Sequence, residues 1–170
     1  EEDVDSIRWA TRHYMMRLTR IIHDGRLAAR LQWLNLCLVF LERISDHNDN
    51  LADLSMDIQH RVRPADLDYV RRAGESLYLG IEPILGNVLN AWANREDDGS
   101  RHATGIRSFR TEYLAKSEQF QVELVEKISR GEISSTAGFI LTEYISEMDR
   151  IVRHSKKIAG ILEKYTALVA

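Results

Sequence analysis

The sequence has little cysteine and no clear excess of either charge. A single cysteine, Cys37, can form no disulfide within the chain, which favours a reducing compartment. Lysine and arginine number 23 against 26 acidic residues, and the net charge of −3 argues against a dedicated nucleic-acid binder. The most apolar run, residues 33–41, is far shorter than the roughly 20 residues of a membrane-spanning helix. We therefore expect a soluble globular chain with no transmembrane segment of its own.

Proline is also scarce, and signals for β-structure are missing. Only Pro64 and Pro83 occur, there is no Asn-Gly dipeptide, and apolar and polar residues do not alternate along any long segment. These features favour long helices over most of the chain. We predict five of them, at residues 2–24, 26–60, 65–97, 101–129 and 132–168.

The predicted breaks between these helices carry recognisable end signals. Gly25 suits the C-terminal cap of the first helix, and Pro64 fits the first turn of the third. Residues 97–100 and 130–131 separate the remaining helices. Pro83 should kink the third helix or split it. Since short connections join long helices to antiparallel neighbours, the fold class is all-α, an antiparallel helical bundle.

A motif occurs twice in the chain. Residues 42–54 and 149–161 share an acid followed by Arg-Ile, then a histidine (His47 and His154), then an apolar residue followed by alanine. The ends of the preceding helices also match, at residues 22–25 and 128–131. The natural unit is a repeat of three helices whose third helix carries the motif. We predict a first repeat at 1–62 that lacks its leading helix and a complete second repeat at 63–170, packed as one domain. A missing helix and the first residues, Glu-Glu-Asp, suggest that the chain begins inside a longer protein.

The segment from Leu41 to Ala52, Leu-Glu-Arg-Ile-Ser-Asp-His-Asn-Asp-Asn-Leu-Ala, resembles the signature helix of PhoU-type proteins. It is most similar to the cytoplasmic PhoU-like region of bacterial sodium/phosphate cotransporter-family proteins. The resemblance covers the chain apart from one leading helix. It implies two three-helix repeats, a regulatory rather than catalytic role, and metal ions held on the bundle surface by acid pairs spaced four residues apart.

Four carboxylates lie along one stripe of the first motif helix. Glu42, Asp46, Asp49 and Asp53 fall within about 60° of one another when drawn on a helix. With no lysine or arginine four residues on, they repel one another, and a cation would relieve that repulsion. A solvated acidic face is the alternative interpretation.

The preceding helix offers a second acid pair, Glu1 and Asp5. In a hairpin turning near residue 25, Glu1 would lie beside Asp49, and Asp5 beside Asp46. We therefore predict a metal site formed by Glu42, Asp46, Asp49, Asp5 and Glu1. Oxygen ligands favour magnesium, calcium or manganese but also accept iron or zinc, and the resemblance implies iron or zinc.

The second motif helix departs from this pattern. Arg153, Lys156 and Lys157 replace acids or asparagine of the first, and Arg150 precedes them. This half should not bind a cation. Its basic residues form either a solvated face or a surface for an anion, an acidic partner or an anionic membrane.

His47 and His154 lie nearer the apolar side of their helices, so we interpret them as packing or hydrogen-bonding residues. His154 with Lys157 is also similar to a histidine phosphotransfer site, although Ile158 stands where glycine is usual. No Glu-x-x-His, His-Glu-x-x-His or Gly-rich phosphate loop occurs. We expect a non-enzymatic protein with no catalytic residues.

The function implied by the resemblance is regulation of phosphate transport from the cytoplasm. The expected partner is the transmembrane transporter part of the same chain, which would tether the domain to the inner membrane, and a signalling protein is a second expected partner. An apolar groove left by the missing helix predicts a homodimer. The alternatives are a metal-dependent or His-phosphotransfer helical-bundle enzyme, and a structural adaptor.

Overall fold

The structure is a computed structural model that describes residues 2–93 and 99–169, and the side chains of residues 4–91 and 100–164. These residues form five α-helices and no strand, which confirms the predicted all-α bundle. The helices are α1 (Glu2–Thr19), α2 (Gly25–Arg61), α3 (Pro64–Ala93), α4 (Gly99–Ser129) and α5 (Ser135–Val169). The predicted ends at residues 94–97 lie outside the described residues.

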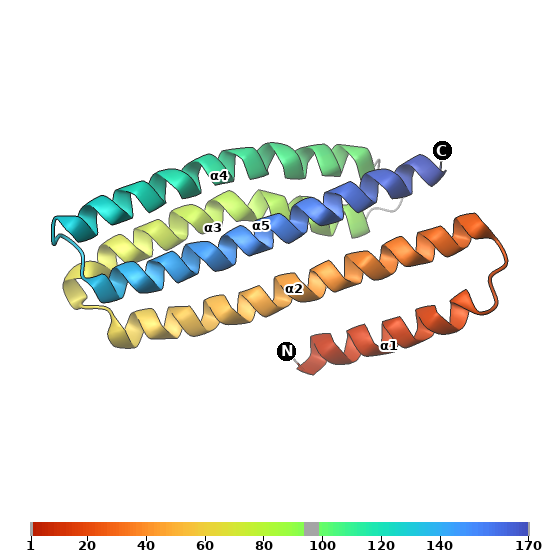
Figure 1. The fold of residues 1–170 in the computed structure, drawn as a ribbon, viewed down its shortest axis with the longest axis horizontal. Helices are drawn as coiled ribbons and strands as arrows, with labels where there is room; N and C mark the ends of the chain where they lie inside the picture. Colours follow the sequence, from red (N-terminus) through yellow and green to blue (C-terminus); the bar gives the residue numbers. More distant parts are fainter. Residues whose placement is uncertain (1, 94–98, 170) are drawn as a thin grey trace.

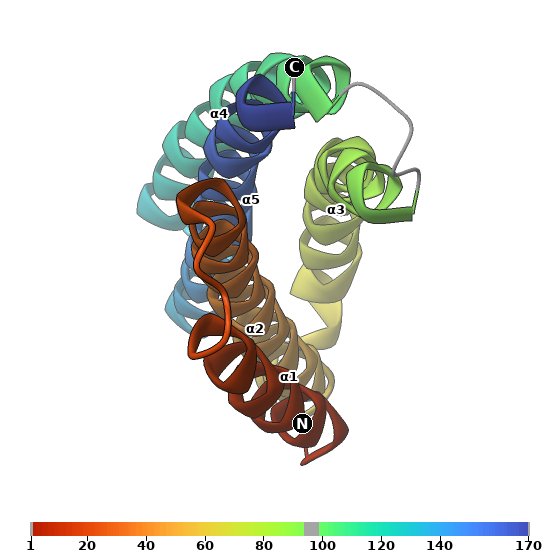
Figure 2. The ribbon, with the colours of Figure 1, turned by 90° about the vertical axis from the view of Figure 1, so that its right-hand side faces the viewer.

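The long helices α2 and α5 pack against each other along the middle of the bundle (Figure 1). α4 packs on α5, and α3 packs on both α4 and α5. α1 packs on α2 and lies on the side of α2 away from α3 and α4 (Figure 2). The second half of the chain is therefore a three-helix unit, whereas the first half is a hairpin of two helices.

The turn between α1 and α2 is formed differently from the prediction. α1 ends at Thr19 rather than near residue 24. Asp24 is the N-cap of α2, and its Oδ1 accepts a hydrogen bond of 2.8 Å from the backbone N–H of Arg26. Gly25 is thus the first residue of α2, not the C-terminal cap of α1. The capping Asp24 determines this turn more strongly than the glycine does, because its side chain accepts hydrogen bonds from N–H groups that have no partner within α2.

Both prolines lie in α3. Pro64 is its first residue, as predicted, since a first turn needs no N–H there. Pro83 does not split the helix, which continues to Ala93. One turn after Pro83, the side-chain amide of Asn87 donates a hydrogen bond of 2.8 Å to the Pro83 carbonyl.

The turn between α4 and α5 is closed by Gly131, the only residue with a positive φ (71°) in the described part of the chain. The N–H of Gly131 donates to the carbonyl of Ile128, and that of Glu132 to the carbonyl of Lys127, both at 3.0 Å. This pair of bonds is a Schellman motif, which favours glycine. The predicted break at residues 130–131 is confirmed.

Asp66 connects the starts of α3 and α5. Its buried carboxylate accepts two hydrogen bonds of 2.9 Å from the Arg63 guanidinium and one of 2.6 Å from the Ser134 hydroxyl. Ser134 in turn caps α5, with its hydroxyl oxygen 3.3 Å from the Ala137 nitrogen. Two turns that are far apart in sequence are therefore joined at one end of the bundle.

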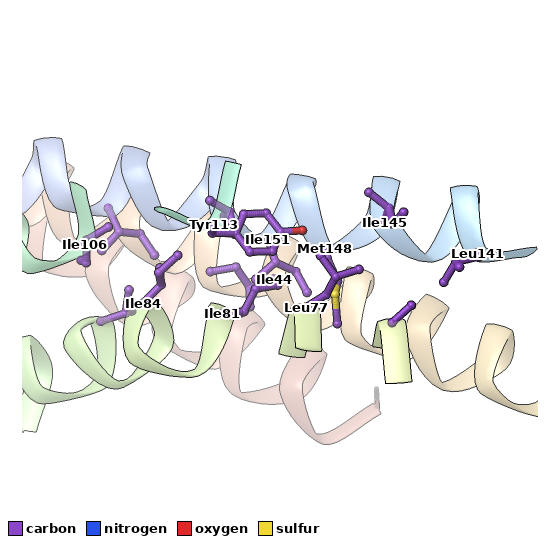
Figure 3. Close-up of a cluster of buried hydrophobic side chains, with 14 of the residues drawn as sticks. Ile44, Leu77, Ile81, Ile84, Ile106, Tyr113, Leu141, Ile145, Met148 and Ile151 are labelled. Carbon is purple, nitrogen blue, oxygen red and sulfur yellow. The ribbon is translucent and has the colours of Figure 1, made fainter. Parts of the chain in front are cut away.

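The hydrophobic core lies between α2, α3, α4 and α5, and none of the described side chains of α1 belongs to its main cluster. Figure 3 shows the central side chains of this cluster. In the apolar segment around Pro83, four residues are buried, and Leu79 and Leu89 face the solvent. The buried four are Leu77, Ile81, Ile84 and Val88.

None of the helices, over the described residues, combines the length and apolar character needed to cross a membrane.

Candidate functional site: the contact between the two motif helices

The first acid of the predicted metal site is used to join two helices. Glu42 of α2 forms an ion pair with Arg8 of α1, and its side chain is only 12% exposed. Arg8 is also 3.4 Å from Asp5 on its own helix. The guanidinium of Arg8 therefore neutralises two of the carboxylates that were expected to hold a metal. Glu42 does not belong to an outward-facing acidic stripe, because it faces α1.

The remaining predicted ligands do not gather around one point. Asp46 is 3.1 Å from Arg43, three residues earlier on α2. Asp49 is exposed. Glu1 lies outside the described residues. Within the described part of the chain, no group of three or more histidine, cysteine or acidic side chains is placed to hold a metal ion. The metal site stays a prediction, and the arginines near its acids do not favour it.

The same acid position in the second motif has the same structural use. Asp149, the equivalent of Glu42 at an offset of 107, accepts a hydrogen bond of 3.0 Å from the Ser117 hydroxyl of α4. In both halves, then, the first acid of the motif binds the helix that precedes the motif helix. A contact between helices therefore accounts for an acid at this position in both motifs, and no bound metal is needed to explain it.

The two motif helices meet around a buried carboxylate, Glu147 of α5. His47 Nδ1 of α2 lies 2.7 Å from its Oε2, and the Asn50 side chain donates to the same oxygen at 3.0 Å. Since an ionised carboxylate only accepts, His47 carries its proton on Nδ1. Arg150 binds the other oxygen of Glu147 at 2.5 Å. Burial works to raise the pKa of Glu147, but the bonds from Asn50 and His47 and the charge of Arg150 outweigh it, so the pKa lies below its usual value.

His154 lies between two rings of α2. It stacks on His47, with centroids 5.4 Å apart, and on Phe40, with centroids 5.7 Å apart. Its Nδ1 is buried and has no hydrogen-bond partner among the described residues. Burial lowers the pKa of His154, and the nearby charges of Lys157, His47, Arg43 and Arg153 lower it further. Lys157 also lies over the Phe40 ring, 5.0 Å from its centre. Both histidines pack between helices, as we interpreted them.

These contacts exchange when the repeat offset of 107 is applied. Phe40 and Glu147 are equivalent positions, as are His47 and His154, and Asn50 and Lys157. The contact of His47 with Glu147 becomes that of His154 with Phe40, and the contact of Asn50 with Glu147 becomes that of Lys157 with Phe40. The stack of His47 on His154 maps onto itself. The centre of the α2–α5 contact therefore has local twofold pseudosymmetry.

An open groove of about 540 Å³ lies beside this contact, between α2 and α5. Half of its lining residues are acidic: Asp53 and Asp57 on α2, and Glu143 and Glu147 on α5. Asp57 is paired with Arg61 at 2.8 Å, and Glu147 with the residues described above. The groove is thus partly neutralised by the protein itself.

The basic residues of α5 divide into two kinds. Arg150 and Lys157 have partners within the bundle, Glu147 and Phe40. Arg153 and Lys156 are exposed on the same helix, and no ion pair or ring contact described above involves them. All four residues are exposed, so they can share the predicted basic surface.

Two residues of this centre were not identified as contact residues from the sequence. Glu147 and Phe40 lie just before the parts of the motif that match, and they differ in chemistry, so no identity between the repeats marks them. The available signal was an acid in the apolar surroundings of residues 145–148. Of the tryptophans, Trp33 is half-buried and Trp9 is 69% exposed, stacked on His13. The Trp92 side chain lies outside the described residues.

Neither protein-family models, nor curated proteins, nor solved structures match this chain.

Proposed function

We propose that this chain is a PhoU-like regulatory domain of a sodium/phosphate cotransporter-family protein. In this proposal it acts by binding rather than by catalysis, and it modulates phosphate transport from the cytoplasmic side of the inner membrane. The transmembrane transporter part of the same chain is its main partner, and a signalling protein is the second. The proposal starts from the resemblance of the first motif helix and does not depend on any bound ligand.

One observation carries the proposal, namely the pseudosymmetric contact of α2 with α5. Resemblance to PhoU-type proteins implies two repeats whose motif helices are equivalent, and residues in the two motifs make equivalent contacts here. The chemistry of the contact also favours a binding role. His154 is enclosed by His47 and Phe40, and His47 is bonded to Glu147, so both rings serve packing between helices.

The metal ion implied by the resemblance does not fit the described acids as they are placed. Arg8 already pairs with Glu42 and Asp5, and Arg43 pairs with Asp46. A bound cation would have to displace these guanidinium groups. The proposed regulation therefore includes no step through a metal.

The surface best suited to a partner is the exposed basic pair of α5, Arg153 and Lys156. An unpaired positive surface attracts acidic protein segments and anionic lipid headgroups, and the attraction extends over about 10 Å at moderate salt. A domain tethered beside a membrane would meet both. We infer that these residues face the transporter part.

The test is phosphate uptake in the organism of origin. The coding sequence is replaced with one carrying Arg153→Glu and Lys156→Glu, and sodium-dependent uptake of radioactive phosphate is measured in phosphate-rich and phosphate-poor medium. We expect the double variant to lose the difference between the two media. The matched control is Arg71→Glu with Arg72→Glu, which reverses two exposed arginines on α3.

Two results would overturn the proposal. One is normal phosphate control in cells from which the coding sequence is deleted. The other is turnover of phosphate esters by the purified chain, or an acid-labile phosphate on His154, which would favour the enzymatic alternative.

A further inference from the structure

One face of α1 is apolar and uncovered. Val4, Ile7, Tyr14 and Ile21 are 39%, 65%, 63% and 70% exposed. They are spaced in steps of three and four residues together with Thr11 and Leu18, which are half-buried. This spacing is that of a coiled-coil seam. The seam continues just past the end of α1, because the Ile21 N–H still bonds to the Leu18 carbonyl. We call these six residues the α1 seam.

The internal repeat indicates what kind of element covers such a face. The matched helix ends at Ile22 and Ile128 pair α1 with α4 at an offset of 106. At this offset, Ile7 and Tyr14 correspond to Tyr113 and Phe120. Tyr113 is only 1% exposed and Phe120 packs against the core, in the unit where α3 lies on α4 and α5.

The motif helices show the same contrast. Leu141 and Ile145 of α5 are each 1% exposed. Their equivalents on α2, Leu34 and Leu38, are only half-buried. Among the described residues, no helix covers the α1–α2 hairpin at the place where α3 covers the α4–α5 hairpin, and the open face is apolar.

The charges of α1 indicate which helix would fit. Residues 1–5 contain glutamate or aspartate at positions 1, 2, 3 and 5, whereas residues 12–20 contain Arg12, Arg17 and Arg20 and no acid. An antiparallel copy of the same helix would bring each acidic end to a basic end, and it would also oppose the two helix dipoles favourably. A parallel copy would place like charges together.

We propose that the α1 seam is a self-association surface, on which two copies of this chain pair their α1 helices antiparallel. The two hairpins then form a four-helix bundle across a twofold axis. In the register that aligns the two seams, Val4 of each copy lies opposite Ile21 of the other, Ile7 opposite Leu18, and Thr11 opposite Tyr14.

The first test is the mass of the purified chain in solution, measured by sedimentation equilibrium over a wide concentration range. We expect a monomer–dimer equilibrium. Tyr14→Glu should raise the dissociation constant about tenfold or more, because it places a charge in the seam. Met16→Glu is the matched control, since Met16 is 53% exposed on the opposite face of the same helix, and it should leave the equilibrium unchanged. Circular dichroism of both variants shows whether α1 remains folded.

The second test reports the orientation. Val4→Cys and Ile21→Cys chains are oxidised separately and as a mixture; the native Cys37 is 2% exposed and gives little background. The antiparallel pairing predicts a disulfide-linked dimer in the mixture only. Cross-linking of each variant with itself would overturn the antiparallel arrangement. A monomer at every concentration, or equal weakening by Tyr14→Glu and Met16→Glu, would overturn the surface itself. None of these outcomes bears on phosphate uptake, so this inference and the proposed function can fail separately.

Discussion

His47 and His154 stack on each other at 5.4 Å, with their rings inclined by only 15°. They occupy the same position in the two motifs, so a residue of one repeat meets its own equivalent in the other. Two equivalent residues on different helices can contact each other only where the pseudo-twofold axis that relates the helices passes between them. The pair therefore marks the centre of the α2–α5 contact, and its protonation bears directly on how firmly the two halves hold together.

Acid should weaken this contact through His154. Because burial and neighbouring positive charges lower the pKa of His154, the unfolded chain binds its proton more readily than the folded chain. The stability contributed by the neutral ring is fully present above the usual value of 6.5 and is lost as the pH falls below it. His154→Phe keeps a ring in the stack and removes the titration. We expect its free energy of unfolding to fall less than that of the wild type between about pH 7.5 and about pH 5.5 in urea denaturation.

The control for this effect is His60→Phe, which removes an exposed histidine of α2. It should keep the wild-type dependence on pH. If His154→Phe also keeps that dependence, the titrating group lies elsewhere in the protein.

Loss of the Glu147 carboxylate should destabilise the bundle. In Glu147→Ala, the polar groups of His47 and Asn50 lose their partner in a partly buried place, at a cost of about 1–3 kcal/mol. The free energy of unfolding from urea titration at neutral pH measures this loss. Glu143→Ala, one turn earlier on α5 and on the same groove, should change it by about 0.5 kcal/mol or less. Equal effects would mean that the groove, rather than the hydrogen bonds, sets the stability.

Asp66 should protect the protein in acid. The hydrogen bond from Arg63 is the main reason that the pKa of Asp66 falls to about 2, and the bonds from Ser134 add to it against the cost of burial. The stabilisation is therefore fully present above the usual value of 3.8 and disappears as the pH falls through about 2. Asp66→Asn should lower the free energy of unfolding by about 1–3 kcal/mol at neutral pH.

The acid unfolding of Asp66→Asn should also begin at a higher pH, as followed by circular dichroism. Asp68→Asn is the comparison, because Asp68 is 76% exposed and pairs with Arg72 on the surface. If both substitutions shift acid unfolding equally, general charge effects account for it.

Arg8 should compete with any metal at the predicted acid site. Removing it in Arg8→Ala leaves Glu42 and Asp5 without their cation. We expect isothermal titration with zinc or ferrous ions to give at least about tenfold tighter binding to Arg8→Ala than to the wild type, and Glu42→Gln in the same background to abolish the gain. Arg12→Ala, an exposed arginine one turn further along α1, serves as the control. Stoichiometric wild-type binding that disappears in Asp46→Asn would instead support the metal site as first predicted.

Much of the fold could be predicted because helix signals are local. The break at Gly131 and the helix start at Pro64 each depend on the conformation of a few neighbouring residues. Proline is scarce elsewhere, so little interrupts the helices between these points. Gly25 was assigned to the wrong helix, because the glycine and the capping Asp24 are adjacent and both signals fit the turn. Pro83 was expected to kink or split α3; it does not split the helix, and the packing of Leu77, Ile81, Ile84 and Val88 on both sides of it favours one continuous helix.

The site was harder to predict, because its residues are brought together only by the packing of α2 on α5. The repeat identified His47 and His154 but could not show that they would meet. Helix periodicity placed Glu42 on an outward stripe with Asp46, whereas the position of α1 encloses it beside Arg8. A stripe on one helix becomes solvent-exposed or enclosed according to its neighbours, and one helix considered alone does not contain that information.

The exchange of contacts across α2 and α5 also has a historical consequence. A single ancestral repeat with one histidine at this position would have paired with an identical chain, its ring stacked on its own copy across a true twofold axis. Fusion of two such chains would free each half to change alone. Glutamate and phenylalanine at the equivalent positions 147 and 40, and asparagine and lysine at 50 and 157, are the outcome expected of that freedom. One half holds a hydrogen-bonded carboxylate where the other holds an aromatic ring, around a histidine at the same position in both.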